Sequence, residues 1–328
     1  MRQNIRKILS VFAILAVLLV SACGNTKDEA KENSNNSEKE TSYTVKHAMD
    51  TTEIKGTPKR IVVLTNEGTE ALLALGIKPV GAVQSWLGNP WYDHIQDEMK
   101  DVEVVGTESE VNLEKIAALK PDLIIGNKIR QEKVYDKLSQ IAPTVFAETL
   151  RGDWKENFSL YAKAVNREEE GTKVLNQYED KVAALKEKLG DKTNQEVSVV
   201  RFMAGVTRIY YTDSFSGVVF NELGFKRTAT QEKLFKADNK LGNLAVEVGK
   251  EAIPDMDGDV LFYFTYAPEG DKDAAATEKE WTNDSLWKNL NAVKNGKAYK
   301  VDDATWNTAG GVLAANIMLD DIEEIFSK

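Results

Sequence analysis

The feature that most constrains the fold of this chain is a helical pattern near its middle, between Trp154 and Leu189. Its apolar residues recur every three or four positions, which places them on one stripe of a helix. The stripe consists of Trp154, Phe158, Tyr161, Val165, Val174, Tyr178, Val182, Leu185 and Leu189. It breaks at 166–170, where Asn166 and Glu169 have the spacing of a capping box, so we predict a short helix, a joint and a long helix.

The long helix should run from Arg167 to Leu189. At about 1.5 Å per residue it would extend roughly 35 Å, about the diameter of a small domain. This length and central position favour a spacer between two lobes, although an ordinary surface helix has the same periodicity. We therefore predict lobes at 43–153 and 191–328, joined by connecting helices at 154–190.

The first 22 residues have the pattern of a secretory signal peptide. Positively charged Arg2, Arg6 and Lys7 precede an uncharged apolar run at 8–20, which is too short and wrongly flanked for a transmembrane span. Cys23, the only cysteine, follows small residues and precedes a polar segment, which resembles the lipobox of bacterial lipoproteins. The resemblance implies a lipid anchor on Cys23 at the extracytoplasmic face of the cell membrane; the alternative is a buried or incidental thiol. Because a single cysteine forms no intrachain disulfide, the fold must be held by its core.

Residues 23–42 are expected to form a disordered tether. The stretch 25–42 is rich in Lys, Glu, Asn and Ser and holds no large apolar residue, so it cannot bury enough surface to offset the entropy of ordering. Removal of residues 1–22, which carry three positive and no negative charges, takes the formal net charge from −10 to −13. A protein this acidic, without a basic run, is not a nucleic-acid binder.

Both halves of the chain alternate strand and helix patterns. In the first half we predict a hairpin at 43–45 and 51–54, a strand–helix–strand unit at 61–83, a helix at 112–119 followed by a strand at 123–126, a helix at 134–140 and a strand at 144–146. In the second half we predict strands at 197–202, 208–211, 260–264 and 298–301, with helices at 217–223 and from about 310 to 326. The predicted fold is α/β with two Rossmann-like lobes, the first with a mainly parallel sheet.

Cationic and aromatic side chains gather near the ends of the predicted strands in both lobes. They are Trp86, Lys128 and Arg130 in the first lobe, and Arg201, Arg208, Tyr211, Tyr266 and Trp306 in the second. Because open α/β sheets bind ligands beyond the carboxyl ends of their strands, cations gathered there in an acidic protein indicate a local anion site. The alternatives are that Lys128 and Arg130 flank a helix in solvent, and that the aromatic side chains close the edges of the core.

Four stretches, together with the lipobox, carry a resemblance to a known family. They are NEGTEALLALGIKPVG at 66–81, NLEKIAALKPDLIIGNKIRQEKVYDKLSQIAPT at 112–144, TRIYYTDSFSGVVFNELGF at 207–225 and TWNTAGG at 305–311. From Cys23 to its C-terminus the chain resembles iron-siderophore-binding lipoproteins, the substrate-binding subunits of ABC importers. The resemblance implies a class III periplasmic-binding-protein fold of the helical-backbone type. It also implies a ferric siderophore, of hydroxamate or citrate-based carboxylate type, in the cleft between the lobes.

The same resemblance implies which residues hold the siderophore. The expected contacts are Lys128, Arg130, Arg201 and Arg208 for charge, Trp86, Tyr211, Tyr266 and Trp306 as aromatic walls, and Asn307 as a polar group. Arginine suits this role because its planar fork donates two parallel hydrogen bonds to a carboxylate or hydroxamate oxygen pair. The siderophore's own oxygens enclose the ferric ion, so we expect neither a protein metal site nor a cofactor, and His47 and His94 are the only histidines.

The resemblance further implies the partners of the protein. Family members dock on their permease through one exposed acidic residue on each lobe, and the matching positions here are Glu70 and Glu222. The alternative is that both are ordinary solvated helical glutamates. We expect a monomer that works with ABC permease and ATPase subunits and touches the membrane only through its lipid anchor. The long helix predicts a stiff joint, and therefore a small hinge motion on binding.

Two other functions stay open. The same fold could carry haem, cobalamin or another chelate, although haem usually takes an axial His or Tyr and bare zinc takes His ligands. An extracytoplasmic hydrolase would need a nucleophile and a base, but the sequence has no Gly-x-Ser-x-Gly motif, and we expect no enzyme. The acidic run 255–259 has its glycine too early for an EF-hand loop and predicts a turn.

Overall fold

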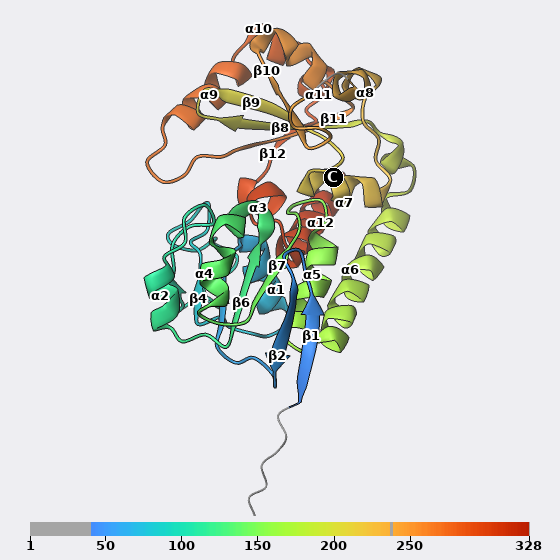
Figure 1. Ribbon diagram of the computed structural model, residues 1–328. Coiled ribbons are helices and arrows are strands. Elements are labelled where there is room, and N and C mark those ends of the chain that lie inside the picture. The colour runs from blue at the N-terminus through green and yellow to red at the C-terminus, as the bar shows by residue number, and fades with distance from the viewer. Residues whose placement is uncertain (1–40, 237–238, 328) are drawn as a thin grey trace, which may run out of the picture. The chain divides into compact units, whose positions relative to one another are not determined.

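The computed structural model describes residues 41–236 and 239–327 (Figure 1). The predicted signal peptide, Cys23 and the tether up to residue 40 therefore lie outside the described residues. Within the described part, no helix combines the length and the apolar character that a membrane crossing requires. The first element is a hairpin of β1 (Ser42–Lys46) and β2 (Thr51–Lys55), which pair antiparallel as predicted.

The first lobe is built on a five-stranded parallel sheet in the order β5-β4-β3-β6-β7. Its strands are β3 (Ile61–Val63), β4 (Gly81–Ala82), β5 (Glu103–Val104), β6 (Leu123–Asn127) and β7 (Thr144–Ala147). Its helices are α1 (Asn66–Ala74), α2 (Leu113–Ala118), α3 (Lys128–Gln131) and α4 (Tyr135–Ser139). The predicted parallel sheet is confirmed. β5 was not predicted, because two residues carry too short a pattern to read.

Side-chain caps fix where the helices of the first lobe begin. Thr65 accepts a hydrogen bond from the backbone N–H of Gly68 at 3.0 Å and so starts α1 directly after β3. Asn127, the last residue of β6, accepts one from the N–H of Ile129 at 2.8 Å and starts α3 without an intervening loop. Residues that follow these strands are therefore held at the carboxyl edge of the sheet.

The second lobe has a five-stranded mixed sheet in the order β10-β9-β8-β11-β12. Its strands are β8 (Val197–Met203), β9 (Val206–Tyr210), β10 (Ala245–Val248), β11 (Val260–Thr265) and β12 (Ala298–Lys300). Strands β8, β11 and β12 are parallel, whereas β9 runs antiparallel to β8 and β10. The cause is local: only two residues join β8 to β9, and Gly205 among them has a φ of 65°, so this connection makes a hairpin.

The remaining helices of the second lobe lie on this sheet and at its edges. They are α7 (Phe215–Leu223), α8 (Ala229–Lys236), α9 (Asp273–Thr282), α10 (Ser285–Lys288) and α11 (Asn291–Lys294). Ser214 caps α7 by accepting from the N–H of Gly217 at 3.0 Å, and Gly224 ends it with a φ of 91°. The predicted helix at 217–223 is thus confirmed.

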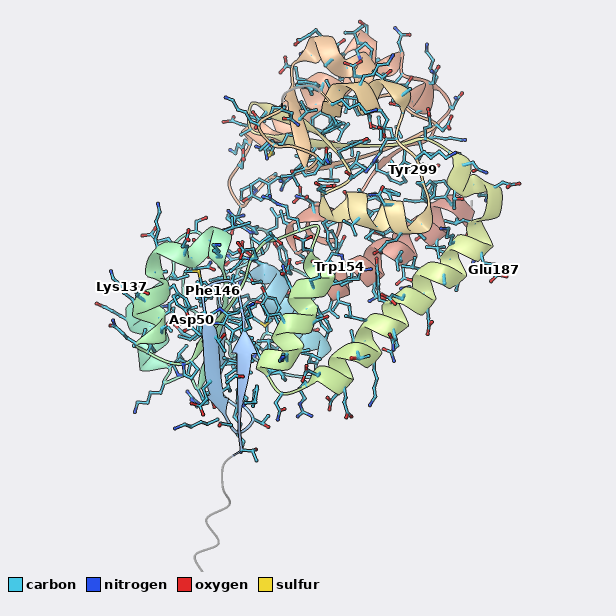
Figure 2. The ribbon with its side chains drawn as sticks, turned by 45° about the vertical axis from the view of Figure 1, so that its right-hand side comes forward. Asp50, Lys137, Phe146, Trp154, Glu187 and Tyr299 are labelled. Carbon is cyan, nitrogen blue, oxygen red and sulfur yellow. The ribbon has the colours of Figure 1, made fainter. Side chains whose placement is uncertain are left out.

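The connecting segment forms α5 (Trp154–Ala164) and α6 (Glu168–Leu189), which confirms the short helix, the joint and the long helix. Figure 2 labels Trp154 at the start of α5, where it is buried, and Glu187 near the end of α6, where it is exposed. The predicted capping box is wrong. Asn166 has a left-handed φ of 56° and its side chain donates to Thr57 at 3.0 Å, so it does not take the extended conformation of a cap.

The C-terminal helix, α12 (Val312–Ser327), is a second link between the lobes. It follows a π-helical turn at Ala304–Thr308 and packs against α1 of the first lobe, α6 and α7. Lys181 of α6 forms an ion pair with Asp320 of α12 at 2.7 Å. The described residues, 41–236 and 239–327, belong to one compact unit, and the domain boundaries predicted inside it stay a prediction.

Candidate binding site

A cavity of about 210 Å³ lies where the carboxyl ends of strands from both sheets meet. The first lobe contributes Glu67, Trp86, Glu108, Arg130, Leu150 and Arg151, and the second contributes Arg201, Met203, Arg208, Tyr210, Tyr266 and Asn307–Gly310. Six of the predicted ligand-binding residues line it, namely Trp86, Arg130, Arg201, Arg208, Tyr266 and Asn307. We call this cavity the arginine pocket, because four guanidinium groups line it.

Arg130 reaches the pocket from α3, directly after β6. Its Nε atom lies 3.4 Å from Oε2 of Glu108, an ion pair without hydrogen-bond geometry. Its guanidinium also lies over the ring of Trp86, 5.6 Å from the ring centre. Glu108 is held in turn by Asn66, whose backbone and side-chain N–H groups donate to Oε1 at 2.7 and 2.8 Å. The cation and its aromatic cover are thus anchored to the first lobe.

Arg201, on β8, is held by a buried bidentate ion pair. Its Nε and Nη2 atoms donate to the two carboxylate oxygens of Asp303 at 2.6 and 2.9 Å, and Nη1 donates to the hydroxyl of Tyr210 at 3.2 Å. Burial alone would lower the pKa of Arg201, but the negative charge of Asp303 outweighs this and raises it. Tyr266 covers the guanidinium at 4.7 Å. Arg201 is therefore charged, and its planar fork is already engaged within the protein.

Arg208 faces Arg201 across the β8–β9 hairpin, where the two are register partners. Like charges in such a pair repel each other, and each arginine is offset by its own acid. Arg208 donates from Nε and Nη2 to Oε1 of Glu247, at 3.1 and 2.6 Å. Burial acts to lower the pKa of Arg208, and the hydrogen bonds to Glu247 raise it overall.

Arg151 and Glu67 line the pocket but were not predicted. Arg151 lies in the loop between β7 and α5 and remains accessible to solvent in the pocket. Glu67 lies in the first turn of α1, and its side chain accepts from Asn157 at 2.8 Å. Burial raises the pKa of Glu67 well above its ordinary value, against the hydrogen bonds from Asn157 and from the backbone of Arg151, which act to lower it.

Three predicted residues lie outside the pocket lining. Lys128 forms an ion pair with Glu148 at 2.6 Å. Tyr211 is nearly buried, stacks on Phe235 at 4.1 Å and donates to Glu232. It points away because alternate residues of a strand face opposite sides, and its neighbour Tyr210 faces the pocket instead.

Trp306 is the third residue outside the lining. It is fully buried in the core, where its ring lies 4.9 Å from that of Phe262 and its Nε1 donates to Asp321 at 2.8 Å. The next residue, Asn307, reaches the pocket from the same π-helical turn. This motif thus lies beside the pocket, but its large aromatic side chain stabilises the core of the second lobe.

The structure contradicts an exposed docking role for Glu70. Its side chain is fully buried: Oε1 bonds Nε2 of His94 at 2.5 Å, and Oε2 accepts from the backbone N–H of Ala314 at 3.0 Å. Glu70 therefore ties α1 to the first turn of α12, where a carboxylate also complements the helix dipole. The sequence misled because a glutamate in an amphipathic helix usually faces water.

Glu222, the other predicted docking residue, is partly exposed on α7. Lys155 of α5 donates to one of its oxygens, and the hydroxyl of Tyr178 of α6 donates to the other at 2.7 Å. It therefore lies where both connecting helices meet the second lobe. Its docking role stays a prediction.

The histidines lie away from the pocket lining. His47 contacts Thr52 at 2.9 Å within the hairpin, and His94 bonds Glu70. Across residues 41–236 and 239–327, the side chains of His, Cys, Asp and Glu form no group of three or more that could hold a metal ion.

Comparison with known proteins assigns the fold. A family model described as "Periplasmic binding protein" matches residues 61–305. The chain belongs to the periplasmic binding protein family. Its fold is the class III type, in which a long helix joins two α/β lobes, as predicted.

Relatives of this periplasmic binding protein are similar over nearly their whole length. "Probable siderophore-binding lipoprotein YfiY" of Bacillus subtilis is 57% identical, covering 100% of this chain and 99% of that protein. "Fe(3+)-citrate-binding protein YfmC" of the same organism is 31% identical, covering 100% of both. Among solved structures, Staphylococcus aureus SirA complexed with staphyloferrin B is 43% identical with a TM-score of 0.79, covering 87% of this chain and 98% of that chain.

Proposed function

We propose that this periplasmic binding protein is a lipid-anchored receptor that binds a ferric siderophore in the arginine pocket and delivers it to an ABC permease. The observation that carries the proposal is the set of four guanidinium groups, from both lobes, that line one cavity together with Trp86 and Tyr266. Guanidinium groups recognise paired oxygens, and aromatic rings cover the apolar parts of a ligand. An iron chelate with an oxygen-rich, anionic surface suits such a lining.

The proposed cargo is an anionic siderophore of the citrate-hydroxamate or citrate-based carboxylate kind. A ferric trihydroxamate without other charges is neutral, because three hydroxamates balance the charge of ferric iron. A chelate in which an α-hydroxycarboxylate replaces one hydroxamate is anionic, and the positive pocket favours it. The names of YfiY, YfmC and the SirA complex support this cargo class, since they refer to a siderophore, ferric citrate and staphyloferrin B.

Entry of the cargo requires the pocket to widen. Its volume of about 210 Å³ is below the roughly 300–1,000 Å³ of typical small-molecule sites. Both α6 and α12 link the lobes, so we propose that widening is a small hinge motion around these helices. Small-angle scattering of free and loaded protein tests this proposal. A change of several ångströms in the radius of gyration would exclude a small hinge motion.

The proposed location and partners follow from the N-terminus and from the family. Lipidation of Cys23 would hold the receptor at the outer face of the cell membrane, and the tether would let it reach a permease and its ATPase subunits. We propose that Glu222 takes part in docking, because it is partly exposed at the end of the second lobe's first helix.

A binding titration tests the proposed function. The form that starts after Cys23 is titrated with ferric citrate-hydroxamate, carboxylate, trihydroxamate and catecholate siderophores, with haem and cobalamin as controls of equal absorbance. Tryptophan fluorescence reports binding, because iron complexes quench nearby indoles and Trp86 lines the pocket. Saturable submicromolar quenching by an anionic ferric class is expected. Saturable quenching only by haem or cobalamin would assign another cargo. If no compound gives saturable quenching, the proposed function is refuted and the fold assignment stands.

A further inference from the structure

The four arginines of the pocket differ in one respect that bears on ligand recognition. Arg130, Arg201 and Arg208 each have a carboxylate partner within the protein, at 3.4, 2.6 and 2.6 Å. The side chain of Arg151 has no hydrogen-bond or ion-pair partner among the described residues. Among the described residues, its guanidinium is thus the only one of the four pocket guanidinium groups without a carboxylate partner.

The backbone of Arg151 is fixed from several sides. Its N–H points to Oε2 of Glu67 at 3.4 Å, and its carbonyl accepts from the N–H of Trp154 at 3.3 Å. The loop before it is held at the carbonyl of Thr149, which accepts from the side chain of Asn157 at 2.8 Å. The direction in which the Arg151 side chain leaves the loop is therefore set before a ligand arrives, which reduces the entropy lost on binding.

Arg151 also has a backbone conformation that arginine rarely adopts. Its φ is 76°, in the left-handed region that favours glycine. A side chain in this region is strained, and such strain is found where the side chain serves a purpose that glycine cannot. Nothing else in the loop requires a guanidinium here, because the side chain makes no bond to the described residues.

The surroundings of Arg151 are electrostatically unfavourable in the empty pocket. Desolvation lowers the pKa of Arg151, and Tyr210 acts in the opposite direction. The positive charges of Arg130, Arg201 and Arg208 lower this pKa further. An anionic ligand group would relieve this repulsion, and a cationic one would add to it.

We propose that Arg151 is the residue that selects cargo by charge: its guanidinium binds an anionic oxygen pair of the ferric chelate and sets the preference for anionic over neutral or cationic chelates. This inference rests on the proposed function and deepens it. Arg201 and Arg208 then act chiefly as parts of the pocket wall, with their charges already balanced by Asp303 and Glu247.

The test measures charge selectivity in variants of Arg151. Soluble Arg151→Gln, Arg151→Lys and Arg151→Gly proteins are titrated with a ferric citrate-dihydroxamate, a neutral cyclic ferric trihydroxamate and a ferric trihydroxamate bearing a free ammonium group. Arg167→Gln is the control, because Arg167 is an exposed arginine outside the pocket. We expect Arg151→Gln to weaken binding of the anionic chelate by roughly 30-fold or more and to weaken the neutral chelate far less. Arg151→Lys should restore part of the preference.

Arg151→Gly separates recognition from structure. It removes both the guanidinium and the left-handed strain, so the melting temperature should stay the same or rise while the affinity for the anionic chelate falls. A lowered melting temperature, or an equal loss of affinity for all three chelates, would overturn the inference by showing a structural role. If the wild-type protein binds the anionic chelate and the Arg151 variants keep the same charge selectivity, the inference about Arg151 is overturned and the proposed function stands. Wild-type protein that binds no ferric chelate would overturn the proposed function as well.

Discussion

Replacement of Asp303 by alanine should cost the protein a large part of its stability. The Arg201 and Asp303 side chains are 9% and 1% exposed, and two hydrogen bonds join them. Removal of Asp303 would leave the Arg201 guanidinium buried with only the Tyr210 hydroxyl as a partner. Breaking a buried pair in this way typically costs about 3–5 kcal/mol, because one charge stays buried without compensation. Because the free energy of unfolding of a folded domain is roughly 5–15 kcal/mol, this loss of stability should be readily measurable.

Urea denaturation followed by circular dichroism measures this change. The matched control is Glu170→Ala, which breaks the exposed pair between Arg167 and Glu170 and should cost less than about 1 kcal/mol. A double variant, Arg201→Met with Asp303→Leu, should recover most of the loss, because it removes both charges together.

The outcome decides the role of Arg201. A loss below about 1 kcal/mol for Asp303→Ala would mean that water reaches the guanidinium and that the pair is not the fixed wall described above. A double variant as unstable as the single one would show that the polar geometry itself, and not the stranded charge, is required.

Three further predictions follow from the site and its surroundings. Glu67→Gln should gain stability relative to wild type as pH rises above about 4.5. The reason is that the raised pKa of Glu67 favours the folded state at low pH, and this contribution to wild-type stability is lost as the carboxyl ionises. Parallel curves of unfolding free energy against pH for the two proteins would contradict this prediction. Trp86→Phe should remove most of the ligand-induced quenching, whereas Trp306→Phe should retain it, and the reverse would move the ligand away from the pocket. Glu222→Ala should reduce siderophore uptake by cells without changing soluble affinity, and the exposed Glu179→Ala is its control; equal uptake in both would remove Glu222 from docking.

The sequence predicted the elements that depend on local pattern. The stripe from Trp154 to Leu189 forms α5 and α6, and the predicted strands of both lobes form where expected. Arg130 lies in α3, which starts directly after β6 with Asn127 as its cap, so its place in the pocket could be predicted from residue order. Arg151 obeys the same strand-end rule, since it follows β7 by a few residues, and that signal could have found it.

What the sequence could not show depends on contacts between distant residues. Glu70 is buried only because α12 returns to pack on α1, more than two hundred residues later in the chain. Tyr210 and Tyr211 are equal candidates in the sequence, and the register of the β8–β9 hairpin decides which faces the pocket. The pairing of Arg201 with Asp303 likewise joins a strand to a distant turn.

We propose that the arginine pocket holds a ferric chelate whose iron is ligated by the chelate and not by the protein. The most direct test is diffraction at the iron absorption edge from crystals of the soluble form grown with its best-bound ferric siderophore. We predict an anomalous iron peak between the guanidinium groups of Arg130 and Arg151 on one side and the second lobe on the other, with no protein atom at coordination distance. An iron peak outside this pocket, or one coordinated by a protein side chain, would contradict the account.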